Sequence, residues 1–262
     1  MNILDVTNAK GAKMGKIFMI IGRSGTGKDT IYKNLIADRS LLLNPIVTYT
    51  TRPKRPGEQE GVEYHFVDEE RMRHLDEEKQ IVEKRCYHTK NGDWYYFTVD
   101  NDINLESGSY LTIGTLDSFM SYKKYFAKKF HYRKYDPNYE IIYPIYLSVP
   151  DDILHNRLVL RENESGKPDF VEMNRRFSQD SIDFSTSEIL KADIDCQFEN
   201  INLEDCIKEI RRHINFIQMG FIEVNIKDKA YINPKTSQMS FLTKSNKEVD
   251  INYTGTIDVK EV

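Results

Sequence analysis

The sequence is poor in cysteine, and the cysteines it has form no recognisable pattern. Only Cys86, Cys196 and Cys206 occur among 262 residues, an odd number without the spacing of a metal site. Reduced thiols of this kind are typical of a cytosolic protein rather than of a disulfide-stabilised secreted domain. We therefore expect a cytoplasmic protein.

Long apolar runs and an excess of positive charge are also lacking. No stretch approaches the ~20 apolar residues of a membrane span, and residues 1–14 form a polar leader without the apolar centre of a signal peptide. The net charge of −4 argues against general binding to nucleic acid or membrane surfaces. With 39% hydrophobic residues, the chain can still build a sizeable core.

One glycine-rich segment has the context that a phosphate-binding loop requires. It follows a continuous apolar run, Lys16–Ile21, that is typical of a buried parallel strand, and it precedes a helical pattern, Ile31–Ala37. Glycines let successive backbone N–H groups point at phosphate oxygens in front of a helix N-terminus. The loop consists of Gly22, Arg23, Ser24, Gly25, Thr26, Gly27, Lys28, Asp29 and Thr30. Lys28 is expected to reach the β- and γ-phosphates, and Asp29 stands where a metal-binding Ser or Thr is usual.

A second segment is basic and stiffened by proline. A strand expected over Ile46–Thr50 leads to Arg52 and Arg55, and an alternating strand is expected over Val62–Val67. An arginine side chain offers a planar fork that matches a phosphate group bidentately. Taken alone, a cluster of this kind is more often a solvated surface loop.

The middle of the chain shows further strand and helix patterns. A hairpin is expected from Gln80–Tyr87 and Trp94–Val99 around an Asn-Gly turn. Further strands are expected over Tyr110–Gly114, Ile141–Val149 and Cys196–Asn200, and helices over Glu69–Leu75, Thr115–Lys129, Asp151–Leu160 and Leu203–Ile217. The polar stretch Arg161–Asp169 is expected to be flexible, with Asp169 capping another helix.

After Gly220 the pattern changes to short alternating pieces. These predict two to four β-strands with polar turns, and they carry no motif that indicates a function. The tail is interpreted as an extension packed on the core or on another subunit, or as a poorly ordered terminus.

The two motif segments together resemble the guanylate kinases. The resemblance rests on the phosphate loop, on the run Thr50-Thr51-Arg52-Pro53-Lys54-Arg55-Pro56-Gly57-Glu58, and on Gly61, Tyr64 and Phe66-Val67. That family phosphorylates GMP to GDP with MgATP, so the resemblance implies ATP and Mg²⁺ as cofactors and GMP as the small-molecule substrate. No nucleic-acid or membrane partner is expected, and the chain is expected to be a monomer or a homodimer.

The resemblance also implies the domain organisation. An α/β fold is expected over residues 15–213, in which a P-loop core with a parallel sheet flanked by helices carries two additions. These are a mixed β/α GMP-binding insertion at about 47–105 and a lid at about 161–176. Residues 214–262 are expected to form a β-rich C-terminal extension of unknown role.

Carried over position by position, the resemblance implies three groups of site residues. The lid and loop cations Lys28, Arg161 and Arg176 are expected to stabilise the transferring phosphoryl group. The loop Gly22–Thr30 is expected to hold ATP, with Asn200 near the adenine. The acceptor phosphate is assigned to Thr48, Arg52, Arg55, Tyr64 and Tyr96, and the guanine base to Glu83 and Thr98.

The sequence departs from the family pattern at three places. Gly114-Thr115-Leu116 stands where the family has Asp-x-Asp, and Phe97 replaces a glycine in a way expected to crowd the site. Asp29 looks like the ribose bisphosphokinase relatives of the family, and we interpret it as a Mg²⁺ ligand, direct or through water. Two alternatives therefore stay open: a kinase with another phosphorylated acceptor, such as a ribose bisphosphate, and a non-catalytic guanylate-kinase-like binding module, which the retained loop lysine and glycines disfavour.

Overall fold

The structure is a computed structural model that describes residues 14–89, 92–130, 140–194 and 196–219 and five later strands. The polar leader expected over residues 1–14 lies outside the described residues except for Met14, which packs against the core. Within the described residues, no helix has the length and apolar character needed to cross a bilayer.

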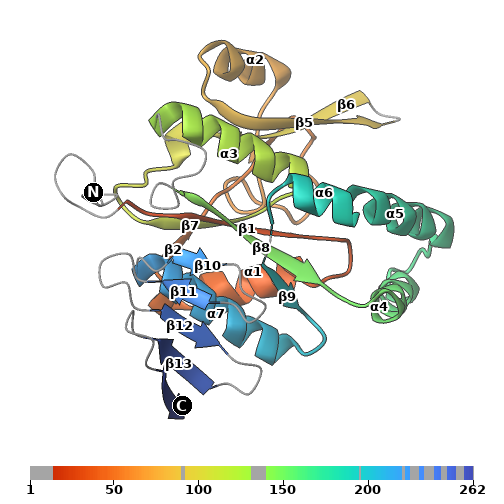
Figure 1. Cartoon of the computed structure of the whole chain (residues 1–262). Coiled ribbons are helices and arrows are strands. Elements are labelled where there is room, and N and C mark those ends of the chain that lie inside the picture. Colours follow the sequence, from red (N-terminus) through yellow and green to blue (C-terminus); the bar gives the residue numbers. More distant parts are fainter. Residues whose placement is uncertain are drawn as a thin grey trace.

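A five-stranded parallel sheet forms the centre of the molecule (Figure 1). Its order is β2 (Leu43–Pro45), β7 (Ser109–Ile113), β1 (Ile17–Gly22), β8 (Ile142–Ser148) and β9 (Gln197–Glu199). Because β1 lies in the middle and has helices on both faces, all six of its residues are buried, which explains its continuous apolar sequence.

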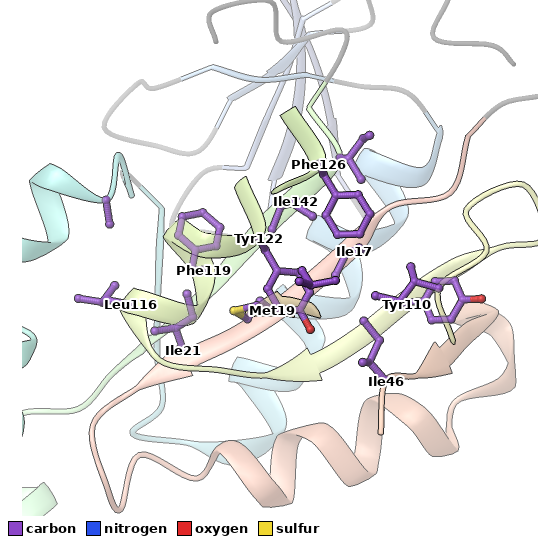
Figure 2. Close-up of a cluster of buried hydrophobic side chains, with 14 of the residues drawn as sticks. Ile17, Met19, Ile21, Ile46, Tyr110, Leu116, Phe119, Tyr122, Phe126 and Ile142 are labelled. Atoms are coloured by element: carbon purple, nitrogen blue, oxygen red, sulfur yellow. The ribbon is translucent and has the colours of Figure 1, made fainter. Parts of the chain in front are cut away.

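The side chains of β1 alternate between two hydrophobic cores. Phe18 and Ile20 pack with helices α1 (Lys28–Ala37) and α7 (Leu203–Met219) on one face. On the other face, Ile17, Met19 and Ile21 pack with helix α3 (Leu116–Phe130), whose Phe119, Tyr122 and Phe126 are fully buried (Figure 2). Each large side chain buried in this way contributes ~1.5–3 kcal/mol, and the two cores together hold the strand that ends at the phosphate loop.

The expected insertion forms a smaller mixed sheet. Its order is β4 (His65–Phe66), β3 (Tyr49–Thr50), β6 (Gly92–Val99) and β5 (Ile81–Thr89), and helix α2 (Glu69–Glu77) covers one face. The hairpin prediction is confirmed, because β5 and β6 pair antiparallel from Ile81 and Val99 to Thr89 and Gly92. Residues 90 and 91 of its turn lie outside the described residues.

Two expectations about the insertion are wrong. The strand expected over Val62–Val67 is reduced to β4, because the chain turns just before it: the backbone N–H of Val62 donates to the Gln59 carbonyl oxygen, and that of Gly61 donates to the Tyr64 carbonyl oxygen. Phe97 does not crowd the site. It alternates away from Tyr96 and Thr98 and packs in a core with Met72 and Leu75 of α2.

Three helices form the region expected to contain the lid: α4 (Asp151–Glu164), α5 (Phe170–Asp183) and α6 (Thr186–Lys191). The expected flexible stretch is shorter than predicted, because α4 continues through Arg161 to Glu164. Asp169 caps α5 as predicted, since its side chain accepts the backbone N–H of Glu172. Two short 3₁₀ helices, η1 (Arg39–Leu41) and η2 (Asp100–Asp102), complete the described helices.

The C-terminal extension forms a separate antiparallel sheet, seen beside α7 in Figure 1. It contains β10 (Ile222–Val224), β11 (Ala230–Ile232), β12 (Met239–Leu242), β13 (Lys247–Ile251) and β14 (Ile257–Glu261) in chain order. The sequence predicted two to four strands, and the structure has five. The alternating segment that contains β10 was recognised, whereas β11 has only three residues and is too short to show an alternation. Helix α7 continues to Met219, beyond the boundary expected at 213.

Candidate active site

The phosphate loop leaves the carboxyl end of β1 and requires glycine at two positions. Gly25 and Gly27 have φ angles of +83° and +89°, in the left-handed region that side chains with a Cβ rarely adopt. A Cβ on Gly27 would also lie 2.6 Å from Nδ2 of Asn200. The loop is therefore a tight turn whose backbone N–H groups lie at the start of α1.

Lys28 is the first residue of α1, and its side chain turns back over the loop. Its Nζ donates to the carbonyl oxygens of Gly22 (2.7 Å) and Arg23 (2.8 Å). Burial lowers the pKa of Lys28 below its ordinary value, while the carboxylates of Asp180 and Asp29 act in the opposite direction. A partly desolvated ammonium group of this kind is well placed to meet the charge of an arriving phosphate.

The carboxylate of Asp180, on helix α5, contacts the backbone of the phosphate loop. The backbone N–H of Ser24 donates to Oδ2 of Asp180 at 2.5 Å. Beside it, Arg23 donates to Oδ1 of Asp151 at 2.5 Å and to Oγ of Ser181 at 2.8 Å. Sequence reasoning missed this contact, because Asp180 lies 156 positions from Ser24 and belongs to no motif.

The two lid arginines come together at the loop. Arg161 of α4 and Arg176 of α5 line a cavity of about 260 Å³ that Ser24 also lines. Both side chains are exposed, and Nε of Arg176 donates to Oε1 of Glu172 at 2.7 Å. Lys28 lies close enough to Arg161 for the guanidinium to contribute to the lowering of the lysine pKa. The structure thus gathers the three cations that the sequence analysis assigned to one role.

A larger cavity of about 660 Å³ lies between α1 and the insertion. Three of the expected acceptor residues line it, namely Thr48, Tyr64 and Tyr96, and Asp29 lines it from α1. Its volume lies within the ~300–1,000 Å³ usual for small-molecule sites. Asp29, near the end of the loop, and three of the expected acceptor residues therefore face a common space.

The two arginines of the basic segment are placed differently. Arg52 is buried, and it donates through Nε to the Tyr96 hydroxyl (3.2 Å) and through Nη2 to Oε1 of Glu58 (2.7 Å). This hydrogen bond holds the pKa of Glu58 below its ordinary value. Arg55 has an exposed side chain, and only its backbone N–H reaches Glu58, at 2.7 Å. The structure therefore joins Arg52 to the acceptor cavity but does not bring the Arg55 side chain beside it.

The expected base-binding pair, Glu83 and Thr98, is buried behind Arg85, which lines the acceptor cavity. The Thr98 hydroxyl donates to Oε1 of Glu83 at 3.3 Å, and the Tyr122 hydroxyl donates to Thr98 at 2.9 Å. Two further groups contact the Glu83 carboxylate: the Arg85 guanidinium, and the Ser118 hydroxyl at 3.5 Å. Sequence reasoning missed both. Arg85 could have been found by strand alternation from Glu83, whereas Ser118 comes from α3 and has no local signal.

Asn200 lies beneath the phosphate loop. Its Nδ2 donates to the Thr26 carbonyl oxygen at 2.8 Å, and its buried Oδ1 has no hydrogen-bond partner among the described residues. This hydrogen bond joins the end of β9 to the phosphate loop and helps to hold the loop in its conformation. Its contact with adenine stays a prediction.

Asp29 and Thr30 are both exposed at the start of α1. Asp29 does not belong to a close group of three metal-ligand side chains in the part of the chain that the structure describes. In that part of the chain, such a group is exposed on the β5–β6 hairpin and consists of Cys86, His88 and Asp93, whose ligand atoms lie within 4.8 Å of one another. A metal at Asp29 would therefore need ligands from outside the protein, such as water and phosphate oxygens.

The fold and the site define a class of protein. A glycine-rich loop ends the central strand of a parallel sheet, carries a lysine at the following helix, and faces a second cavity that is lined by hydroxyl and guanidinium groups. This arrangement is typical of P-loop kinases that act on nucleoside monophosphates.

Comparisons with known proteins narrow the class. Residues 14–105 match the guanylate kinase family model. The guanylate kinase of Mesomycoplasma hyopneumoniae strain J is 27% identical over 207 residues, which cover 78% of this chain and 95% of that protein. The guanylate kinase of Porphyromonas gingivalis is 28% identical over 206 residues, 77% of this chain and 97% of that protein.

The fold agrees with these sequence matches. The crystal structure of guanylate kinase from Anaplasma phagocytophilum aligns with a TM-score of 0.51 at 20% identity, over 79% of this chain and 87% of that one. Together the comparisons show that the chain is similar to guanylate kinases in sequence and in fold.

Proposed function

We propose that the protein transfers the γ-phosphoryl group of ATP to the phosphate of GMP, which gives ADP and GDP. The observation that carries this proposal is the buried carboxylate of Glu83 beside the Thr98 hydroxyl. An ionised carboxylate only accepts hydrogen bonds. It therefore matches the adjacent N1–H and N2–H donors of guanine, and it does not match adenine, whose edge presents no such pair.

ATP is assigned to the phosphate loop, residues Gly22–Thr30. The backbone there fits an anionic ligand, because the Ser24 N–H already donates to a carboxylate oxygen and Gly27 leaves no room for a Cβ. Lys28 would reach the phosphates from the same loop. Asn200 stabilises the loop through its hydrogen bond to the Thr26 carbonyl oxygen and is proposed to lie near the adenine.

Mg²⁺ is assigned to Asp29. The donor set fits this ion, because Mg²⁺ usually keeps several waters and takes only one or two carboxylates together with substrate phosphates. When bound, the ion neutralises charge on the phosphates. Asp29 lines the acceptor cavity, so its carboxylate faces the space between donor and acceptor.

The acceptor is assigned to the cavity of about 660 Å³. Its phosphate is proposed to bind the hydroxyls of Thr48, Tyr64 and Tyr96 and the guanidinium of Arg52, which already contacts Tyr96. Arg55 is proposed to join them from its exposed loop. Glu83 and Thr98 would then take the base.

Phosphoryl transfer needs alignment and positive charge more than covalent chemistry from the protein. Lys28, Arg161 and Arg176 are proposed to supply that charge where it develops on the transferring group. A phosphate oxygen of the acceptor is itself the nucleophile, so no general base is required.

The test is a turnover screen with MgATP and a panel of acceptors. GMP is expected to give a higher kcat/KM than AMP, CMP, UMP or ribose 1,5-bisphosphate. A sugar phosphate that outperforms GMP would show that the fold serves another acceptor, the alternative that Asp29 favours. ATP binding without turnover of any acceptor would indicate a non-catalytic module.

A further inference from the structure

Arg85 is a charged residue of the acceptor cavity to which the proposed reaction gives no role. It lies two positions after Glu83 on β5, so both side chains are on the same face of the strand. The Glu83 side chain is 3% exposed and that of Arg85 is 24% exposed. Arg85 lines the cavity, and Glu83 lies behind it.

The guanidinium and the carboxylate form a two-point contact. Nε of Arg85 lies 3.0 Å from Oε2 of Glu83, and Nη2 lies 3.3 Å from Oε1. Burial disfavours the charged form of Arg85, but the Glu83 carboxylate together with Tyr87 and Tyr122 offsets this effect and keeps the pKa of Arg85 above its ordinary value. The pair is therefore ionic and partly desolvated.

This contact leaves no vacant position on the Glu83 carboxylate. Oε1 accepts from Arg85 and Thr98, and Oε2 accepts from Arg85 and Ser118. Each carboxylate oxygen has two lone-pair positions, so all of them are engaged. A guanine base can donate N1–H and N2–H to Glu83 only after one of these donors leaves.

Arg85 is the donor that resembles the base. The N–C–N edge of a guanidinium presents two parallel N–H groups, and the N1–C2–N2 edge of guanine is the same chemical unit. Among the described residues, the hydrogen bonds of Arg85 use Nε and Nη2, and its side chain borders the open cavity. The side chain therefore has space into which it can withdraw.

We propose that Arg85 occupies the base-recognition position of the free enzyme and that GMP must displace it to bind Glu83. This proposal rests on the proposed function. Displacement lowers the apparent affinity for GMP, because only the fraction of molecules with Arg85 withdrawn can bind the base. Arg85 is thus a residue that sets acceptor affinity through Glu83 and does not itself touch the reacting atoms.

The first test separates KM from kcat. Arg85→Lys keeps a cation near Glu83 but loses the two-point fork, and Arg85→Ala removes the group altogether. In Arg85→Lys the KM for GMP is expected to fall about threefold to tenfold, with kcat and the KM for ATP within about twofold of the parent. Lys84→Ala is the matched control, because Lys84 lies on the same strand, faces the other way and pairs with Asp76.

The second test supplies free guanidinium ion to Arg85→Ala, the variant that lacks the arginine guanidinium group. Guanidinium chloride at about 20 mM, far below the molar concentrations that unfold proteins, is expected to compete with GMP in this variant and raise its KM. The same concentration of sodium chloride is expected to have no such effect, and neither salt is expected to change the KM of the parent.

The results of these tests distinguish failure of the Arg85 proposal from failure of the proposed function. A KM for GMP that rises or stays unchanged in Arg85→Lys, together with no competition by guanidinium in Arg85→Ala, overturns the proposal and leaves the GMP kinase activity standing. If the parent chain does not phosphorylate GMP at all, the proposed function and the role of Arg85 both fail.

Discussion

At the scale of single residues, three charged groups of the site already have partners within the chain. Lys28 donates to loop carbonyl oxygens, Arg52 donates to Glu58, and Glu83 accepts from Arg85. A buried charge without such partners would cost several kcal/mol. A substrate that binds these side chains must therefore replace contacts that they already make. Substitution of each residue is expected to change substrate binding or turnover in a measurable way.

Lys28→Ala tests the phosphate loop. The substitution is expected to reduce kcat by about a hundredfold or more, because the ammonium acts on charge that develops in transfer. The fold is expected to persist, since alanine favours a helix and the lysine side chain bonds only to two loop carbonyl oxygens. A coupled assay and the Tm measure the two effects. Activity within a few-fold of the parent would mean that the loop is wrongly assigned.

Asp29→Asn tests the proposed metal ligand. A neutral amide is a weaker Mg²⁺ ligand than a carboxylate, so half-maximal activity is expected to need several-fold more Mg²⁺. Titration of turnover with Mg²⁺ at saturating nucleotide measures the change. A Mg²⁺ dependence identical to that of the parent would remove Asp29 from the metal site.

At the scale of elements, helix α5 is held against the phosphate loop. Asp180 accepts the Ser24 N–H, and Ser181 accepts from Arg23. A carboxylate in this position repels a triphosphate and competes for the same donor. We therefore expect that ATP can bind the loop fully only after this contact of α5 breaks.

Asp180→Asn is expected to raise the affinity for ATP several-fold, because the competing negative charge is removed. Asp183→Asn is the matched control, since Asp183 ends the same helix and accepts from Gln179 away from the loop. Isothermal titration calorimetry gives both dissociation constants. Equal affinities in the two variants would show that the contact of Asp180 with the loop does not oppose ATP.

The elements also show what the sequence could and could not predict. The strand, turn and helix around Gly22–Thr30, the Asp169 cap and the β5–β6 hairpin follow from local signals of a few residues, and all three structures are confirmed. The contacts of Asp180 and Ser118 join segments that are distant in the chain, so no local pattern encodes them. Of the site residues predicted by resemblance, one cavity is lined by Asp29, Thr48, Tyr64 and Tyr96, and the other by Ser24, Arg161 and Arg176. Glu83 and Thr98 are buried and line neither cavity, and the Arg55 side chain is exposed.

At the scale of the whole molecule, the chain builds two separate sheets. The strands β10–β14 pair only with one another among the described residues, whereas α7 buries Ile210, Ile214 and Ile217 in the core of the parallel sheet. The kinase core is therefore expected to end with α7, and the C-terminal sheet is expected to be an addition to it.

A chain that ends at Met219 is expected to stay folded, to bind ATP with the affinity of the full chain, and to unfold within about 5 °C of it. The buried face of α7 is retained in this variant, so the core keeps its packing. Calorimetry and thermal unfolding provide the comparison. If the shortened chain is recovered only as aggregate, the C-terminal sheet is part of the core.

Direct observation of phosphoryl transfer is the decisive measurement. With [γ-³²P]ATP, Mg²⁺ and an equimolar mixture of GMP, AMP and ribose 1,5-bisphosphate, the label is expected to appear first and predominantly in GDP. Label that appears mainly in another product, or that stays in ATP while GMP is present, would contradict the assignment of this chain as a kinase acting on GMP.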